Sequence, residues 1–115
     1  MQDKRSDVLY GSLGLIILKT LEALGPLHGY RIARRIEQIS GDHLALNQGT
    51  LYPALLKLEQ AGWITASWRE SDSGRRVKIY ALTKAGRKHL SKEEAAWQHA
   101  TGIVARFFKI QDEGS

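Results

Sequence analysis

Apolar residues recur at helical spacing near the start of the chain. Within residues 11–25 they follow steps of three, four and one that build a single apolar face, made of Leu13, Ile16, Ile17, Leu21 and Leu24. Gly25 and Pro26 end the predicted helix, because proline cannot continue it and glycine suits the terminal turn. Leu15 and Leu18 lie off this face, so the helix is predicted to have a second apolar side that another subunit could cover.

Two further helices are predicted in the next forty positions. The stretch "HGYRIARRIEQIS", residues 28–40, places isoleucines and an alanine inward and arginines outward. The stretch "LNQGTLYPALLKLEQAGWI", residues 46–64, has an inward stripe of leucines. Asn47 and Thr50 are both candidates for its N-cap, since each offers a side-chain oxygen to an unpaired backbone N–H. Gly62 provides its C-terminal stop.

A β-hairpin and a long helix are predicted to complete the chain. Residues 63–70 and 75–82 favour strands, and the turn-forming "SDSG" separates them. Thr83 can cap a last helix that runs from about residue 84 to near residue 109, about 40 Å at 1.5 Å per residue. Such a helix is long for a domain of this size.

The last helix carries a seam of residues in alternating steps of three and four, broken only by Glu93. Such a seam favours packing against a partner helix, and the simpler alternative is packing within the same domain. The residues predicted at a homodimer interface are Leu15, Leu18, Leu90, Trp97, Ala100, Val104 and Phe107.

The order of three helices followed by a basic hairpin predicts a winged helix-turn-helix. The predicted class is mainly α with a small β-hairpin, with a DNA-binding domain over residues 8–82 and a C-terminal dimerisation helix over residues 83–110. In helix-turn-helix proteins the N-terminal residues of the third helix meet base edges in the major groove, which the polar "NQGT" opening suits. The cations Arg75, Arg76 and Lys78 of the hairpin could reach phosphates, although a charged hairpin is also a common protection for a sheet edge.

Composition supports this interpretation only weakly. The chain of 115 residues has a formal charge of +5 and a pI near 9.7, which favours an anionic partner such as double-stranded DNA. It contains no cysteine, so disulfides and thiolate metal sites are excluded. The longest apolar stretch, residues 13–18, is too short to span a bilayer, so we expect no membrane association and a cytoplasmic setting.

Motifs for catalysis or cofactor binding do not stand out. The four histidines, His28, His43, His89 and His99, have neither i, i+4 pairing nor a neighbouring cysteine, which disfavours a metal site. A phosphate-binding glycine loop, a nucleophile elbow and a paired-carboxylate signature are all missing from the sequence. The sequence therefore predicts no enzyme and no cofactor.

Three linked stretches, "LHGYRIARRIEQIS", "NQGTLYPALLKLEQAGWI" and "RRVKIYALTKAGR", closely resemble the PadR family of bacterial transcriptional regulators. The resemblance covers roughly residues 10 to 90. It implies a winged helix-turn-helix repressor that dimerises through its C-terminal helix and binds a palindromic operator. Carried over residue by residue, it implies DNA contacts by Tyr30, Arg34, Asn47, Gln48, Thr50, Tyr52, Lys57, Arg75, Arg76 and Lys78.

The sequence leaves several alternatives open. Tyr52 could be a half-buried core residue or a contact to the DNA backbone, whereas Trp63, Trp68 and Tyr80 are expected to pack in the hairpin core. The chain resembles the short type of the family, in which aromatic residues of the last helix can line an effector cavity between subunits. Trp97 has a comparable place, so a small aromatic or hydrophobic effector is a possible partner. A winged-helix module that binds protein and no specific DNA is the main alternative function.

Overall fold

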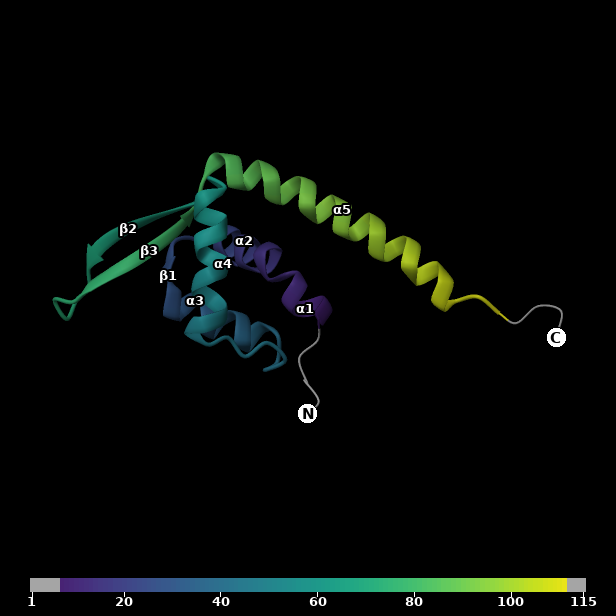
Figure 1. The fold of residues 1–115 in the computed structure, drawn as a ribbon, viewed down its shortest axis with the longest axis horizontal. Helices are drawn as coiled ribbons and strands as arrows, with labels where there is room; N and C mark the ends of the chain where they lie inside the picture. The colour runs from purple at the N-terminus through teal and green to yellow at the C-terminus, as the bar shows by residue number, and fades with distance from the viewer. Residues whose placement is uncertain (1–6, 112–115) are drawn as a thin grey trace.

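The computed structural model of the chain describes residues 7–111, which form five helices and a small sheet (Figure 1). The elements follow the order α1 (Asp7–Gly11), α2 (Leu13–Leu24), β1 (Leu27–His28), α3 (Gly29–Ile39), α4 (Gln48–Gln60), β2 (Ile64–Glu70), β3 (Arg76–Leu82) and α5 (Lys84–Phe108). The architecture is mostly helical with a three-stranded antiparallel sheet, as a winged helix-turn-helix requires.

The core lies where α2 contacts α3, α4 and the start of α5. Its fully buried side chains come from several elements and include Ile17, Ile32, Ile36, Leu55 and Ile64. Leu24 and Ile39, expected to face inward, are exposed. Each is the last residue of its helix, so the apolar stripe there extends past the neighbouring helix.

The connection between α3 and α4 is fixed by side chains that cap its backbone. Leu44 and Leu46 point into the core, and their N–H groups donate to Ser40 Oγ and Glu37 Oε2, both at 3.0 Å. At the start of α4, the Oδ1 atom of Asn47 accepts a hydrogen bond from the Thr50 N–H at 3.0 Å, so Asn47 is the N-cap. Thr50 lies inside the helix. These contacts set the orientation of the start of α4 against the core.

The sheet has the order β1-β3-β2. Strand β2 pairs with β3 in a register that places Trp68 opposite Lys78 and Glu70 opposite Arg76. The two-residue strand β1, which the sequence did not predict, pairs with Ile79 and Tyr80 in the middle of β3. The outer part of the hairpin extends beyond the helices (Figure 1).

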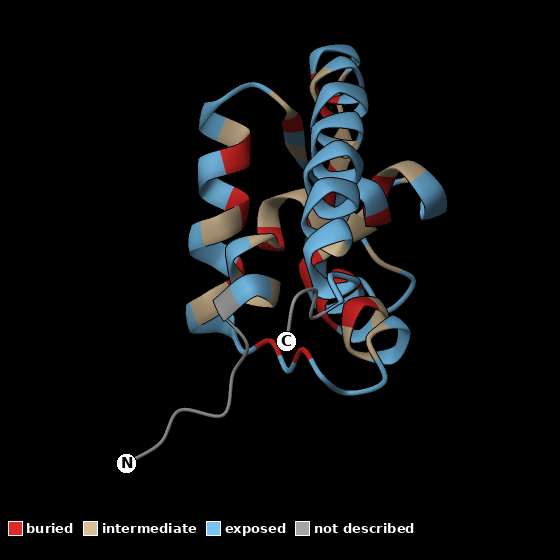
Figure 2. Cartoon of the chain, turned by 90° about the vertical axis from the view of Figure 1, so that its right-hand side faces the viewer, coloured by how far each residue is buried: buried red, intermediate tan, exposed pale blue. Residues whose placement is uncertain are grey.

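Helix α5 starts against the core and then leaves it. Its N-cap Thr83 accepts a hydrogen bond from the Gly86 N–H at 2.9 Å and donates one from its hydroxyl to the Gly62 carbonyl at 2.7 Å. Beyond Leu90 the helix is mostly exposed (Figure 2), and its C-terminal part extends away from the other elements (Figure 1).

Candidate nucleic-acid interface

The first turn of α4 is open to solvent. Gln48 and Gly49 are exposed, while Leu51, Leu55 and Leu58 hold the opposite face of the helix in the core. Asn47 is also exposed, but its Oδ1 atom is engaged as the N-cap, which leaves its amide NH₂ as the available donor. The polar opening of α4 is therefore presented to a partner by a helix whose other side is fixed.

A hollow of about 630 Å³ lies between this helix, the start of α3 and the hairpin. Four of the residues predicted to contact DNA line it together: Tyr30, Tyr52, Arg75 and Lys78. They come from three elements and the hairpin turn. The hollow thus combines cations with aromatic rings on one side of the molecule.

Tyr52 is exposed over 41% of its surface, and the end of its ring packs on the first turn of α3. An added Cβ at Gly29 would lie 2.7 Å from the Tyr52 hydroxyl oxygen, so a larger residue there would require the Tyr52 ring to shift. Burial raises the pKa of Tyr80, with further contributions from nearby Tyr52 and Glu59. Both alternatives for Tyr52 are compatible with this geometry, since the ring is packed and one side remains open.

Trp68 differs from its expected place. It was predicted in the hairpin core, but 58% of its surface is exposed and it lines the hollow. Trp68 lies further out along β2 than Ala66, which packs against the core. The guanidinium carbon of Arg76 lies 5.0 Å from its ring centroid and Lys78 Nζ lies 5.8 Å away. Trp63 and Tyr80, in contrast, pack with the core as expected.

The other residues predicted to contact DNA lie outside this hollow. Thr50 and Lys57 line a second hollow, between α4 and the start of α2. Arg34 pairs with Glu37 at 3.4 Å on the surface of α3. This carboxylate also accepts the Leu46 N–H, so Arg34 is linked to the connection that orients α4.

Comparison with known proteins identifies the family. A family model described as the transcriptional regulator PadR-like family matches residues 17–92. The chain belongs to the PadR-like family of transcriptional regulators.

Solved structures of regulators agree with this assignment. A transcriptional regulator from Clostridium thermocellum is 29% identical, with a TM-score of 0.80 over 90% of this chain and all of the other. A PadR family transcription regulator from Clostridium difficile is 29% identical, with a TM-score of 0.72 over 85% of this chain and 99% of the other. An uncharacterized protein of Lysinibacillus sphaericus is 28% identical over 91% of this chain and 95% of its own length.

In this PadR-like chain, two residues predicted at a subunit interface are part of the chain's own core. Leu18 and Leu90 are each 1% exposed, so their side chains are not available to a partner. Both lie where α2 meets the start of α5. Leu15 is half-buried, and the exposed members of the predicted interface are Trp97, Ala100, Val104 and Phe107.

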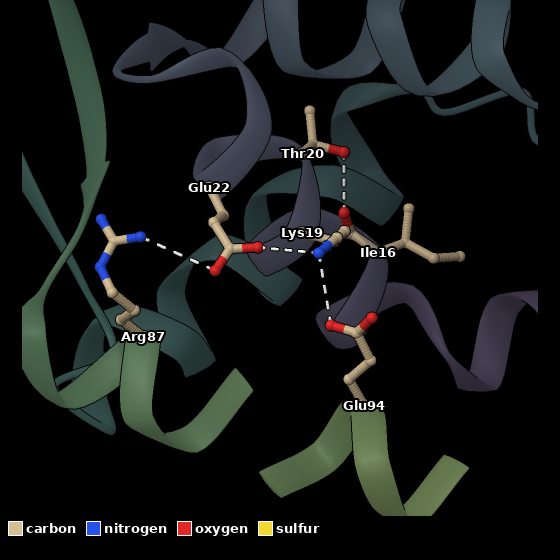
Figure 3. Close-up of polar contacts among 6 residues, drawn as sticks. All are labelled: Ile16, Lys19, Thr20, Glu22, Arg87 and Glu94. Carbon is tan, nitrogen blue, oxygen red and sulfur yellow. Dashed lines mark hydrogen bonds and ion pairs between the residues drawn. The ribbon is translucent and has the colours of Figure 1, made fainter. Parts of the chain in front are cut away.

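Two sets of contacts fix α5 of the PadR-like chain to its helical body. The His89 and Trp63 rings stack with centroids 3.4 Å apart. On the other side, Lys19 pairs with Glu22 at 2.8 Å and with Glu94 at 3.3 Å, and Arg87 lies 3.7 Å from Glu22 (Figure 3). Hydrogen bonding to Glu22 raises the pKa of Lys19, and the same contact lowers the pKa of Glu22.

The described residues offer neither a metal cluster nor a membrane-spanning helix. Among residues 7–111 there is no group of three or more His, Asp or Glu side chains placed to hold a metal ion. None of the helices in that part of the chain is long and apolar enough to cross a membrane.

Proposed function

We propose that the protein is a homodimeric transcriptional repressor that binds a palindromic operator. The first turn of α4 reads bases in the major groove, and the hairpin contacts the flanking backbone as a wing. Two such heads in a dimer would enter successive major grooves about 34 Å apart.

The observation that supports this proposal best is the hollow shared by α4 and the hairpin. Tyr30, Tyr52, Arg75 and Lys78 line this hollow, and Tyr52 lies about one helical turn after the exposed Gln48 in α4. Cations supply affinity for any phosphate backbone, whereas an exposed amide can discriminate between base edges. A surface that serves only protein contacts would not need this combination.

The proposed dimer uses the part of α5 that leaves the core. Trp97, Val104 and Phe107 follow the heptad-like spacing and expose their apolar side chains to solvent in the single chain. Exposed apolar residues gathered along one helix favour association, because burying them removes that surface from water. The exposed half of α5 would then set the distance between the two reading heads.

An effector site would lie at the base of this helix. Leu15, Trp63, His89 and Trp97 line a hollow of about 440 Å³. In this proposal a small aromatic or hydrophobic effector binds there and changes the spacing of the heads. As a transcriptional regulator, the protein would act in the cytoplasm, and at the nucleoid when it is bound to DNA.

The experiment that tests this function is a DNA-binding titration. Purified protein is titrated with the DNA upstream of its own gene and with a scrambled duplex, each across a range of salt concentrations. We expect selective binding that Gln48→Ala abolishes. Arg75→Ala should weaken binding to both duplexes and make the salt slope shallower by about one unit per lost phosphate contact.

The control is Lys92→Ala, which removes one exposed charge from α5 outside the hollow and should leave selectivity unchanged. Equal, weak binding of the unmodified protein to both duplexes would contradict a specific regulator of its own gene. That result would favour the alternative of a winged-helix protein-interaction module.

A further inference from the structure

Trp68 is exposed at a position where the fold does not require a large aromatic ring. It lies in the outer half of β2 and is not part of the core cluster. A tryptophan with more than half of its surface in water contributes little to core packing and adds apolar surface to the hairpin. Its position therefore calls for a role other than folding.

The ring lies among the cations of the hairpin. Trp68 is directly opposite Lys78, and Arg76 lies two residues along β3 on the same face of the sheet. Arg76 Cζ and Lys78 Nζ are 5.0 and 5.8 Å from the indole centroid, within the roughly 6 Å over which a cation is attracted to a ring face. Lys78 Nζ is also 5.9 Å from the Tyr80 ring.

These cations have no acidic partner in the part of the chain that the structure describes. Glu70 is opposite Arg76 in the register, yet the two form no ion pair. The kind of partner that a cation has decides whether its charge is available to an anionic ligand. A carboxylate would neutralise the guanidinium, whereas a ring restrains it and leaves its charge available.

We propose that Trp68 is a positioning residue of the wing, whose indole ring holds Arg76 and Lys78 in place to contact the phosphates of DNA. The proposal rests on the function proposed above. Long cationic side chains lose rotamer freedom when they bind a phosphate. A ring that already restrains them lowers that loss, so Trp68 increases affinity without reading any base.

The test is a double-mutant cycle on binding to the upstream DNA, with Trp68→Ala, Arg76→Ala and the double variant. A cation–π contact at an exposed site corresponds to about a two- to fivefold effect per wing, so about fourfold or more for a dimer with two wings. Arg76→Ala lowers the DNA affinity of the unmodified protein by some factor. We expect this loss to be smaller, by about fourfold or more, when the same substitution is made in Trp68→Ala. Trp68→Phe, which keeps a ring face, should retain part of the affinity.

The matched control is the pair Trp68→Ala and Arg69→Ala. Arg69 has the same charge and neighbours Trp68, but alternation along the strand places it on the other face of the sheet. Its effect on binding should be independent of Trp68, within about twofold. Equal coupling of Trp68 with Arg69 and with Arg76 would overturn the proposal.

A measurement on the free protein separates this proposal from the proposed function. In NMR spectra without DNA, the indole should shift the side-chain protons of Arg76 and Lys78 upfield, and Trp68→Ala should remove that shift. Absence of the shift overturns the proposal, even if DNA binds. The shift together with additive binding effects also overturns it. If the shift is present but the protein binds no DNA, the proposed function fails and the role of Trp68 in it fails as well.

Discussion

Gly86→Ala is expected to destabilise the protein although it replaces glycine with the best helix former. An added Cβ at residue 86 would overlap the carbonyl oxygen of Trp63 and lie 2.7 Å from its carbonyl carbon and 2.9 Å from Leu82 Cδ1. The same carbonyl accepts the Thr83 N–H at 3.0 Å. The methyl group can be accommodated only if the start of α5 moves away from the turn that precedes β2.

The magnitude follows from three effects, of which one stabilises the protein and two destabilise it. Alanine favours a helix by about 1 kcal/mol over glycine. Forcing a methyl group into a packed site costs about 1–3 kcal/mol. Displacing α5 also weakens the hydrogen bonds of Thr83 to Trp63 and to Gly62, at about 1 kcal/mol each. The net expectation is a loss of roughly 2–4 kcal/mol in the free energy of unfolding.

Urea unfolding and thermal melts, followed by circular dichroism, measure this loss. The matched control is Gly102→Ala in the same helix, where an added Cβ meets no atom within 4 Å. It should raise stability by up to about 1 kcal/mol. All proteins are compared at one protomer concentration, because association would make stability concentration-dependent. Similar melting temperatures for Gly86→Ala and the unmodified protein would refute the reasoning.

Three further predictions concern the start of α4, the exposed part of α5 and the ion pairs between helices. Asn47→Ala should lower the free energy of unfolding by about 1 kcal/mol in urea titrations, because the Thr50 N–H loses its cap; unchanged stability would contradict this role. Val104→Glu combined with Phe107→Glu should give monomers in sedimentation velocity with an unchanged circular dichroism spectrum, whereas intact dimers would contradict the proposed interface. Folding lowers the pKa of the Glu22 carboxyl below its ordinary value of 4.5, so the ionised form stabilises the folded protein fully at pH values above 4.5. Glu22→Gln should therefore melt slightly below the unmodified protein at pH 7, and the difference should vanish as the pH falls through the lowered pKa; a difference that persists in acid would count against the ion pairs.

Periodicity predicted the longer helices because each has one face in the core. The leucine stripe of α4 and the Thr83 cap of α5 were confirmed, and of the two candidate caps for α4 the structure selects Asn47. Strand β1 was missed, since two residues are too short to carry an alternating pattern.

The same pattern could not separate a chain's own core from a partner's surface. Leu90 and Phe107 lie on one heptad-like seam, yet Leu90 is buried beneath α2 and Phe107 is exposed. The difference depends on where α5 leaves the core, which is a tertiary property. Trp68 was misplaced for a similar reason, because alternation gives the face of a strand but not how far along the strand the core extends.

Hydroxyl-radical footprinting of the upstream DNA with the purified protein tests the central claim most directly. Two recognition helices in a symmetric dimer predict two symmetric protected tracts, with centres about 10 base pairs apart, that disappear together in Gln48→Ala. A single asymmetric tract, or protection unaffected by that substitution, would contradict a dimer that reads a palindrome through α4.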